Sequence, residues 1–196
     1  MPETIALQPP AVFAAAVDAV RAATLRDELT VTEIAAPGGV APWSIALAAD
    51  VHPARHGNDS ELGTGRFILL HDPAEPEAWG GAFRVVCFAQ APLEAEIGVD
   101  PFLANVAWSW LVDALDSRGA KYSSASGTAT KTLSTGFGEL ATQEDAAQIE
   151  LRASWSPFDH EITSHVEAWG ELLCMLAGLP PVAEGVSLLS ARRDRG

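Results

Sequence analysis

The sequence predicts an α+β fold with a largely antiparallel sheet of about six strands and three main helices, in the order α-ββββ-α-ββ-α. Apolar and polar residues alternate over Trp43–Val51 and Ala147–Trp155, and this period of two is typical of strands with one buried face. Two further segments open with proline and close with glycine, as helices do. Short connections between successive strands favour antiparallel pairing, with the helices packed on the sheet.

The N-terminal part of the chain supplies one helix and two strands. Pro9-Pro10 precedes a helix expected over Ala11–Leu25, whose apolar residues recur on one face from Phe13 onward. A short, imperfect strand is expected at 29–34. It lies ahead of the clearer strand at 43–51.

Two strands in the middle of the chain, Arg66–His71 and Ala82–Gln90, are apolar on both faces. A proline-rich turn around Trp79 joins them. Strands that are apolar on both faces lie at the centre of a sheet, so we expect both to be covered above and below.

The helix expected over Phe102–Arg118 is apolar around most of its surface. Asp100 and Pro101 form its start signal, and Gly119 its stop. At about 100° per residue the apolar arc spans roughly 240°, whereas an ordinary surface helix needs a stripe of about 100°. The arc contains Leu103, Val106, Ala107, Trp108, Trp110, Leu111, Val112, Ala114 and Leu115. Such a helix must be covered on two sides, by its own fold or by a second protein.

The two tryptophans of this helix lie on opposite shoulders of the arc, about 160° apart at 100° per residue. We expect Trp110 to pack in the core against the sheet. We expect Trp108, on the shoulder with Val112 and Leu115, to reach toward a partner or a covering loop, and we favour a partner because tryptophans commonly anchor interfaces.

The C-terminal part supplies two strands and a helix. A weak Ser/Thr/Ala-rich strand is expected at 122–133, followed by the alternating strand at 147–155. The last helix is expected to begin with a capping box at Ser156–Asp159 and to stop at Gly178. Residues 9–181 then form a single domain, and 182–196 a mobile tail with a basic end.

Charge and composition exclude several classes of function. The chain of 196 residues has 26 acidic residues against 12 Lys and Arg, a formal net charge of −14. Phosphate binding needs clustered cations, so this balance argues against nucleic acid and anionic membranes and suits a basic or apolar partner. No segment approaches the ~18 apolar residues of a membrane span, and because Met1–Thr4 has no basic residue we expect no secretion signal there. Since Cys87 and Cys174 do not form a disulfide framework, we expect a cytoplasmic protein.

Few motifs carry chemistry, and we expect no metal and no cofactor. His160 and His165 are five residues apart, which rotates them by about 140° on a helix and separates them as zinc ligands. His165 instead suits a hydrogen-bonded packing role. His71 and Asp72 could form a general-base pair beside the hydroxyls of the strand at 122–133, but Asp72 before a proline also starts an ordinary turn.

Several phrases in this chain resemble an actinobacterial family catalogued only as a domain of unknown function, number 3000. The phrases are Thr64-Gly65-Arg66, His71-Asp72-Pro73, Glu77-Ala78-Trp79, Val106-Ala107-Trp108-Ser109-Trp110-Leu111, Arg152-Ala153-Ser154-Trp155-Ser156-Pro157 and Ala177-Gly178-Leu179-Pro180-Pro181. The resemblance spans roughly residues 10–181 and implies no activity, cofactor or site. The order of elements is also similar to that of type III secretion chaperones, which are dimers that hold partner segments on apolar surface. This chain would carry one strand more.

These observations leave two hypotheses for the function. The first is a non-enzymatic protein-binding or adaptor module that acts as a homodimer through Trp108, Val112 and Leu115 and binds an unknown protein. The alternative is a small-molecule-binding protein or hydrolase, with a site near His71, Asp72 and the Ser/Thr-rich strand.

Overall fold

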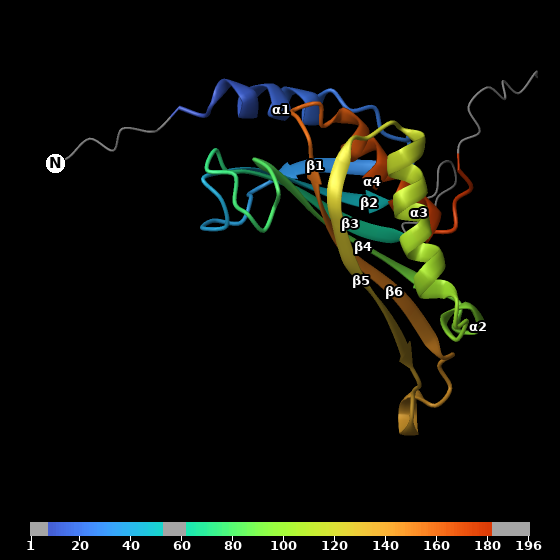
Figure 1. Ribbon diagram of the computed structural model, residues 1–196. Helices are drawn as coiled ribbons and strands as arrows, with labels where there is room; N and C mark the ends of the chain where they lie inside the picture. The colour runs from blue at the N-terminus through green and yellow to red at the C-terminus, as the bar shows by residue number, and fades with distance from the viewer. Residues whose placement is uncertain (1–7, 53–61, 182–196) are drawn as a thin grey trace, which may run out of the picture.

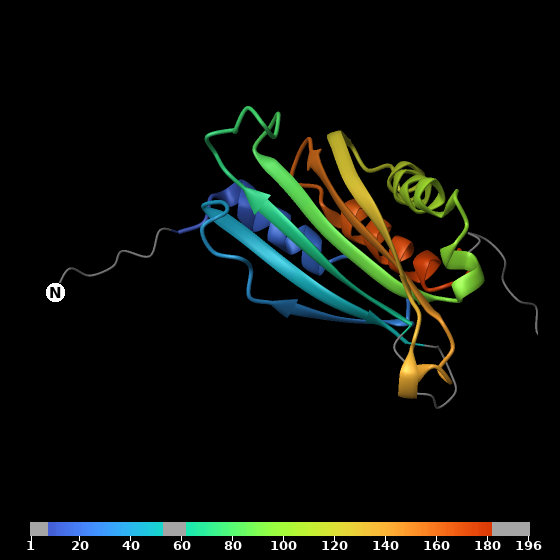
Figure 2. The ribbon, with the colours of Figure 1, turned by 90° about the horizontal axis from the view of Figure 1, so that it is seen from below.

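The computed structural model describes residues 8–52 and 62–181 and confirms the α+β fold. Six antiparallel strands form one sheet in the order β1-β2-β3-β4-β6-β5, and the helices lie on one of its faces (Figures 1 and 2). In chain order the elements are α1 (Ala11–Arg21), β1 (Leu29–Ile34), β2 (Trp43–Val51), β3 (Gly63–His71), β4 (Phe83–Leu93), α2 (Ala95–Gly98), α3 (Leu103–Ser117), β5 (Tyr122–Ser134), the 3-10 turn η1 (Gly138–Leu140), β6 (Ala146–Pro157) and α4 (Thr163–Leu176). The expected tail at 182–196 lies outside the described residues.

Most predicted elements are confirmed, and the differences lie at the ends of helices and strands and in the short helix α2, which was not predicted: β3 begins at Gly63 and not at Arg66, and β4 ends at Leu93 and not at Gln90. Helix α1 ends at Arg21, four residues before the expected end. The predicted capping box is wrong, because β6 continues through Ser156 and Pro157 and α4 begins only at Thr163. The side chain of Asp159 instead accepts a hydrogen bond from the amide of Glu161 at 2.9 Å, within the connecting turn.

The hydrophobic core fills the space between the sheet and the helix layer. Alternate residues of β2, β3, β4 and β6 point into it, and Phe67, Trp155 and Trp169 are fully buried at its centre. The ring of Phe67 lies 6.5 Å from that of Trp155 and 5.7 Å from that of Trp169. Aromatic packing of this kind joins the sheet to α4 and fixes the helix layer on one face.

The opposite face of the sheet, called the open face below, carries no helix of the described chain, as Figure 2 shows. β3 and β4 are central, as predicted, but the expectation that both of their faces are covered holds only at one end, where Leu70 of β3 is 3% exposed. Val86 on the open face is 38% exposed, and its neighbours Ile68 and Phe88 are only half-buried. Apolar side chains on neighbouring strands contact one another and shield this face in part. Strands such as β3 and β4 can therefore be apolar on both faces without a second layer of helices.

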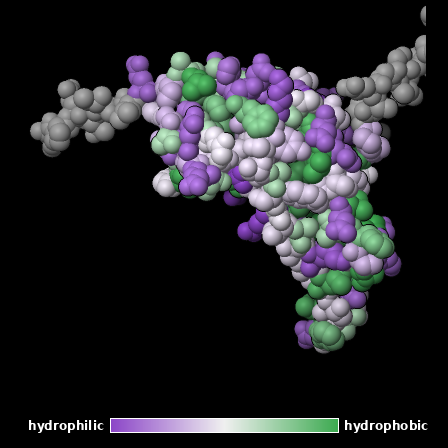
Figure 3. Space-filling model, in the orientation of Figure 1, coloured by the Kyte–Doolittle hydropathy of each residue, from purple (hydrophilic) through white to green (hydrophobic). Residues whose placement is uncertain are grey.

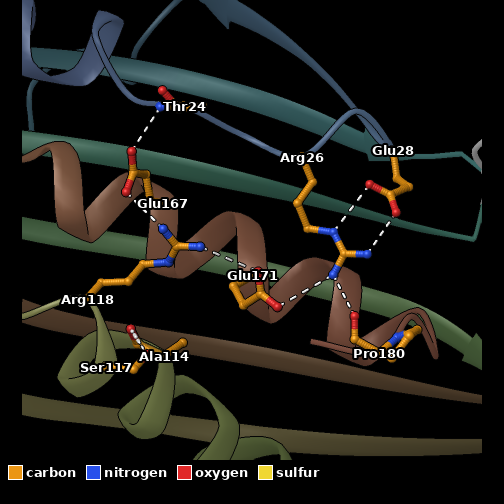
Figure 4. A network of polar contacts seen from close by, with 9 residues as sticks. All are labelled: Thr24, Arg26, Glu28, Ala114, Ser117, Arg118, Glu167, Glu171 and Pro180. Atoms are coloured by element: carbon orange, nitrogen blue, oxygen red, sulfur yellow. Dashed lines mark hydrogen bonds and ion pairs between the residues drawn. The ribbon is translucent and has the colours of Figure 1, made fainter. Parts of the chain in front are cut away.

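A network of ion pairs fastens the helix layer (Figure 4). Arg26, in the connection between α1 and β1, contacts Glu28 at 2.8 Å and Glu171 of α4 at 3.5 Å. Arg118, after α3, contacts Glu167 at 2.9 Å and the second oxygen of Glu171 at 3.6 Å. Carboxylates on two turns of α4 therefore hold the α1–β1 connection and the residue that follows α3. The hydrogen bond from Arg26 lowers the pKa of Glu28.

The remaining global features concern the cysteines and the helix lengths. Cys87 of β4 and Cys174 of α4 are both buried and free, and burial raises their pKa values to about 12 and about 11. Among the described residues, no helix is both long and apolar enough to cross a membrane.

Candidate functional site

Helix α3 is covered on two sides by its own chain. Ala107, Leu111 and Leu115 are buried in the core. On one flank Trp108 lies against β5, where a Cβ added to Gly127 would meet its ring at 2.7 Å. On the other flank Trp110 lines a groove between α3 and the C-terminal end of α4. The wide apolar arc is thus explained largely within one copy of the chain.

This arrangement changes the predicted interface. Trp108 and Trp110 are both half-buried, so the expectation that Trp110 alone packs fully in the core is wrong, and Trp108 is covered by β5 of its own chain. Leu115 is 0% exposed and offers no surface to a partner, and Val112 is half-buried. In a single copy, the three predicted interface residues do not form one exposed patch.

His71, the candidate base, is buried between two phenylalanine rings. It ends β3 on the helix-covered side, only 2% exposed, with Phe13 of α1 stacked on it at 5.8 Å and Phe83 of β4 at 4.6 Å. Neither ring nitrogen has a hydrogen-bond partner among the described residues, and burial lowers the pKa of the imidazole. The adjacent carboxylate of Asp72 accepts a hydrogen bond from the amide of Ala74 at 2.9 Å, as in a turn.

The Ser/Thr-rich strand does not meet His71. β5 is the far edge strand, and two strands, β4 and β6, separate it from β3. Its register with β6 places Ser126 and Thr128 beside Ser154 and Arg152, on the open face, whereas His71 points to the opposite face. The structure therefore does not bring together the residues of the predicted small-molecule site.

His165 has the packing role expected from the sequence. Its Nδ1 accepts a hydrogen bond from the indole Nε1 of Trp155 at 3.0 Å, and the imidazole is 1% exposed. Burial lowers its pKa to about 4, so the ring is neutral at pH 7. His160, by contrast, is exposed and lies before the start of α4.

The described surface exposes most of its large apolar side chains at one end of the molecule, here called the distal surface. Of the eleven that are exposed in the described residues, seven belong to this end. These seven are Ile97, Val99, Phe102, Val106, Leu133, Phe137 and Leu140. They come from α2, the beginning of α3, and the end and turn of the β5–β6 hairpin, where Figure 3 shows hydrophobic residues among hydrophilic ones.

Close backbone packing brings the two halves of the distal surface together. A Cβ added to Gly98 of α2 would lie 2.5 Å from the Cβ of Ala147 and 2.8 Å from a methyl carbon of Leu133, so α2 rests directly on β5 and β6. Lys131 of β5 donates a hydrogen bond to the carbonyl of Asp100 at 2.7 Å, which fixes the turn between α2 and α3. Phe102 follows this turn and is 67% exposed.

Carboxylates line one side of the distal surface. A groove of about 970 Å³ next to α2 is lined by the acidic side chains of Glu94, Glu96, Glu144 and Asp145, and no Lys or Arg lines it. Glu139, in the turn of the hairpin, is also exposed. Apolar patches with a charged rim are typical of protein-binding surfaces, and the rim determines which partner charge they accept.

Sequence reasoning missed most of the distal surface. Phe102 and Val106 were recognised as part of the apolar helix, but nothing distinguished their exposure from the burial of Leu111. The sequence does contain one usable signal, since Phe137 and Leu140 follow Gly136 in a polar connection where an apolar side chain has no strand or helix to bury it.

The comparisons with known proteins agree with the resemblance seen in the sequence. The family model described as "Protein of unknown function (DUF3000)" matches residues 9–187, most of the chain. The chain therefore belongs to this family. No curated protein and no solved structure matches it.

Proposed function

We propose that this protein is a non-enzymatic protein-binding module whose distal surface receives a segment of another protein. The observation that carries the proposal is the gathering of seven of the eleven exposed large apolar side chains at that end. Exposed apolar patches are costly in water and mark binding sites when they are contiguous.

The partner segment that fits this surface combines apolar and basic side chains. Its apolar residues would cover Phe102, Leu133 and their neighbours, while its Lys or Arg residues would face the carboxylates of the groove beside α2. A second copy of this chain is a poorer occupant, because the formal net charge of −14 would bring two acidic rims together.

The alternative of a small-molecule or hydrolase site at His71 and Asp72 has less support. The imidazole is enclosed by Phe13 and Phe83, and the hydroxyls of β5 lie on the other face of the sheet. We further propose a cytoplasmic location, which the two free buried thiols, Cys87 and Cys174, support.

The test compares two phenylalanines of nearly equal exposure at different places on the molecule. Phe102 is 67% exposed on the distal surface, and Phe158 is 66% exposed between β6 and α4. The full chain and its variants Phe102→Ser and Phe158→Ser are titrated with a labelled peptide of alternating leucine and arginine, using fluorescence anisotropy. We expect Phe102→Ser to weaken binding at least tenfold and Phe158→Ser to change it less than twofold.

A peptide in which glutamate replaces arginine serves as the charge control and should bind at least tenfold more weakly than the arginine peptide. Equal affinity for the two peptides would overturn the acidic rim as a determinant. Equal loss in both serine variants, or no loss in Phe102→Ser, would contradict the distal surface as the binding site.

The homodimer expected from the sequence is tested separately, with the same variants. Sedimentation velocity of the wild type at 10 to 500 µM should show a monomer, since α3 is largely covered within one chain. A dimer that Phe102→Ser dissociates would show instead that a second copy occupies the distal surface.

A further inference from the structure

Three neighbouring rows of side chains on the open face of the sheet include arginines and no carboxylates, although Glu150 of the next row pairs with Arg152. Three successive rows of cross-strand neighbours contain Arg66, Arg84 and Arg152 but neither Asp nor Glu. From β1 towards β5 the rows are Thr32, Ala48, Arg66, Phe88, Arg152 and Thr128; then Ile34, Ala46, Ile68, Val86, Ser154 and Ser126; then, starting in β2, Ser44, Leu70, Arg84, Ser156 and Ser123. In a chain with 26 acidic residues against 12 Lys and Arg, this composition is unusual.

Arg84 of β4 is the most constrained of the three arginines. Its Nη1 donates to the carbonyl of Ser124 and to the hydroxyl of Ser156, both at 3.0 Å, and its Nη2 donates to the hydroxyl of Ser154 at 2.6 Å. No carboxylate of the described residues pairs with it, and burial lowers its pKa. A half-buried guanidinium held only by neutral oxygens retains an uncompensated charge.

The guanidinium also retains free donors. Three of its five N–H groups are used in the bonds above, which leaves Nε–H and one Nη2–H without acceptors in the described part of the chain. These two groups can form a bidentate contact with an oxyanion. Arg152 differs, because Glu150 accepts from its Nε at 2.6 Å and its guanidinium lies 5.7 Å from the ring centre of Phe88.

Two serine hydroxyls contact Arg84, and they differ in whether their own hydrogen is already donated to another acceptor. Ser156 accepts from Arg84 and donates to the carbonyl of Trp79 at 2.5 Å, so its hydrogen is used. Ser154 accepts from Arg84, but its own hydrogen has no acceptor among the described residues. Ser154 also lines a hollow of about 420 Å³ with Ser126, Thr128 and Arg152, which gives a ligand access to its hydroxyl from solvent, while Arg84 lies beside this hollow and is not part of its lining.

We propose that Arg84 and Ser154 form a binding site for a phosphate group on the open face. Nε–H and Nη2–H of Arg84 contact two oxygens of the group, and the Ser154 hydroxyl donates to a third. A phosphate group has four oxygens in a tetrahedral arrangement, so it can accept from donors on two strands at once. A planar carboxylate has only two oxygens and fits this set of donors less well. This site is independent of the distal surface. It binds a negatively charged group, whereas the distal surface is proposed to bind a basic segment.

The test is an NMR titration of the full chain with inorganic phosphate, at constant ionic strength maintained with sodium chloride. We expect saturable shifts of the Arg84 Nε–H resonance and of the amides of Ser154 and Ser126 in the millimolar range of phosphate. Acetate is titrated in parallel and should bind at least fivefold more weakly. Shifts that do not saturate with phosphate in the wild-type protein would overturn the proposal, whatever the variants show.

Two arginine variants sharpen the result. Arg84→Gln should weaken phosphate binding at least tenfold, whereas Arg66→Gln, on the same face but in another row, should change it less than twofold. Unchanged binding in Arg84→Gln would place the phosphate elsewhere. Equal or tighter binding of acetate would overturn the assignment of the site to a phosphate group.

Discussion

The helix layer and the open face treat their arginines in opposite ways. In the helix layer Arg26 and Arg118 share Glu171, and each has a further carboxylate in Glu28 or Glu167. On the open face the half-buried Arg84 contacts only serine hydroxyls and a backbone carbonyl. The chain contains enough carboxylates to pair every cation, so the difference reflects where acidic residues are placed and not how many there are.

The comparison indicates two roles for positive charge in one fold. Pairing in a partly buried site ties segments together, because the charges are compensated only when the segments are in place. A cation without a paired carboxylate contributes less to holding segments together and leaves its charge for a ligand. The following predictions test this distinction, from the largest expected effect to the smallest.

Lowering the pH protonates the buried His165, so it tests whether the helix-covered side of the sheet tolerates a positive charge without a paired carboxylate. Burial holds the pKa of His165 near 4, against about 6.5 in an unfolded chain. Its contribution to stability is therefore complete above pH 6.5 and is lost as the pH falls towards 4, by about 3 kcal/mol. Urea unfolding between pH 7 and pH 4.5 measures this loss.

The variant His165→Gln is the control for this pH dependence, and it should flatten the curve in part. His71 contributes in the same direction, because burial lowers its pKa as well. A wild-type curve that is flat over this interval would show that the buried imidazole accepts a proton without cost.

Removing the shared carboxylate tests the paired region. Glu171→Gln should lower the free energy of unfolding by about 2 kcal/mol, because Arg26 and Arg118 both lose charge compensation in a site where Glu171 is 11% exposed. Chemical denaturation measures the effect. The matched control is Glu33→Gln, which breaks the exposed pair with Arg21 and should cost less than about 0.5 kcal/mol.

Replacing the open-face arginine tests the unpaired region. Arg84→Gln should cost only about 1 kcal/mol, the typical net value of hydrogen bonds to groups that water can reach after the change. The same denaturation assay, in buffer without phosphate, compares it with Glu171→Gln. A larger loss than that of Glu171→Gln would remove the distinction between the two regions.

The smallest effect concerns the backbone beside Arg84. Ser124 has φ +54 at the register shift in β5, a conformation that glycine adopts more easily. Ser124→Gly should raise the free energy of unfolding by about 0.5 kcal/mol, and with it the melting temperature. The backbone carbonyl that accepts from Arg84 stays in place. A decrease in melting temperature would mean that the Ser124 side chain contributes contacts that outweigh the strain.

The sequence was most informative where a period of two runs through a whole strand. Trp43–Val51 was predicted with its observed bounds, because alternation over nine residues leaves little freedom of assignment. Helix ends were less well predicted, since α1 stops at Arg21 for reasons of tertiary packing that no local pattern records. The short helix α2 has only four residues and therefore no periodicity to detect.

The candidate sites were harder to predict, because exposure is a tertiary property. Phe67 is fully buried and Phe137 is 80% exposed, although the two side chains are chemically identical. The error at His71 was avoidable in part. The residue follows Leu69 by two positions on one strand, so the two share a face, and that face belongs to the core. Arg84 gave no signal, since its missing carboxylate is visible only in the register of three strands.

The turn of the β5–β6 hairpin, residues 135–145, extends beyond the helix layer (Figure 1). β6 is paired with both β4 and β5 as far as Ala147, whereas the turn has only local hydrogen bonds, such as that from the amide of Leu140 to the carbonyl of Phe137 at 3.2 Å. Hydrogen exchange should therefore be fast in the turn and slow from Ala147 to Trp155. Phe137 and Leu140 of the distal surface lie in this turn, so occupancy there would be recorded as slower exchange at a distance from the core.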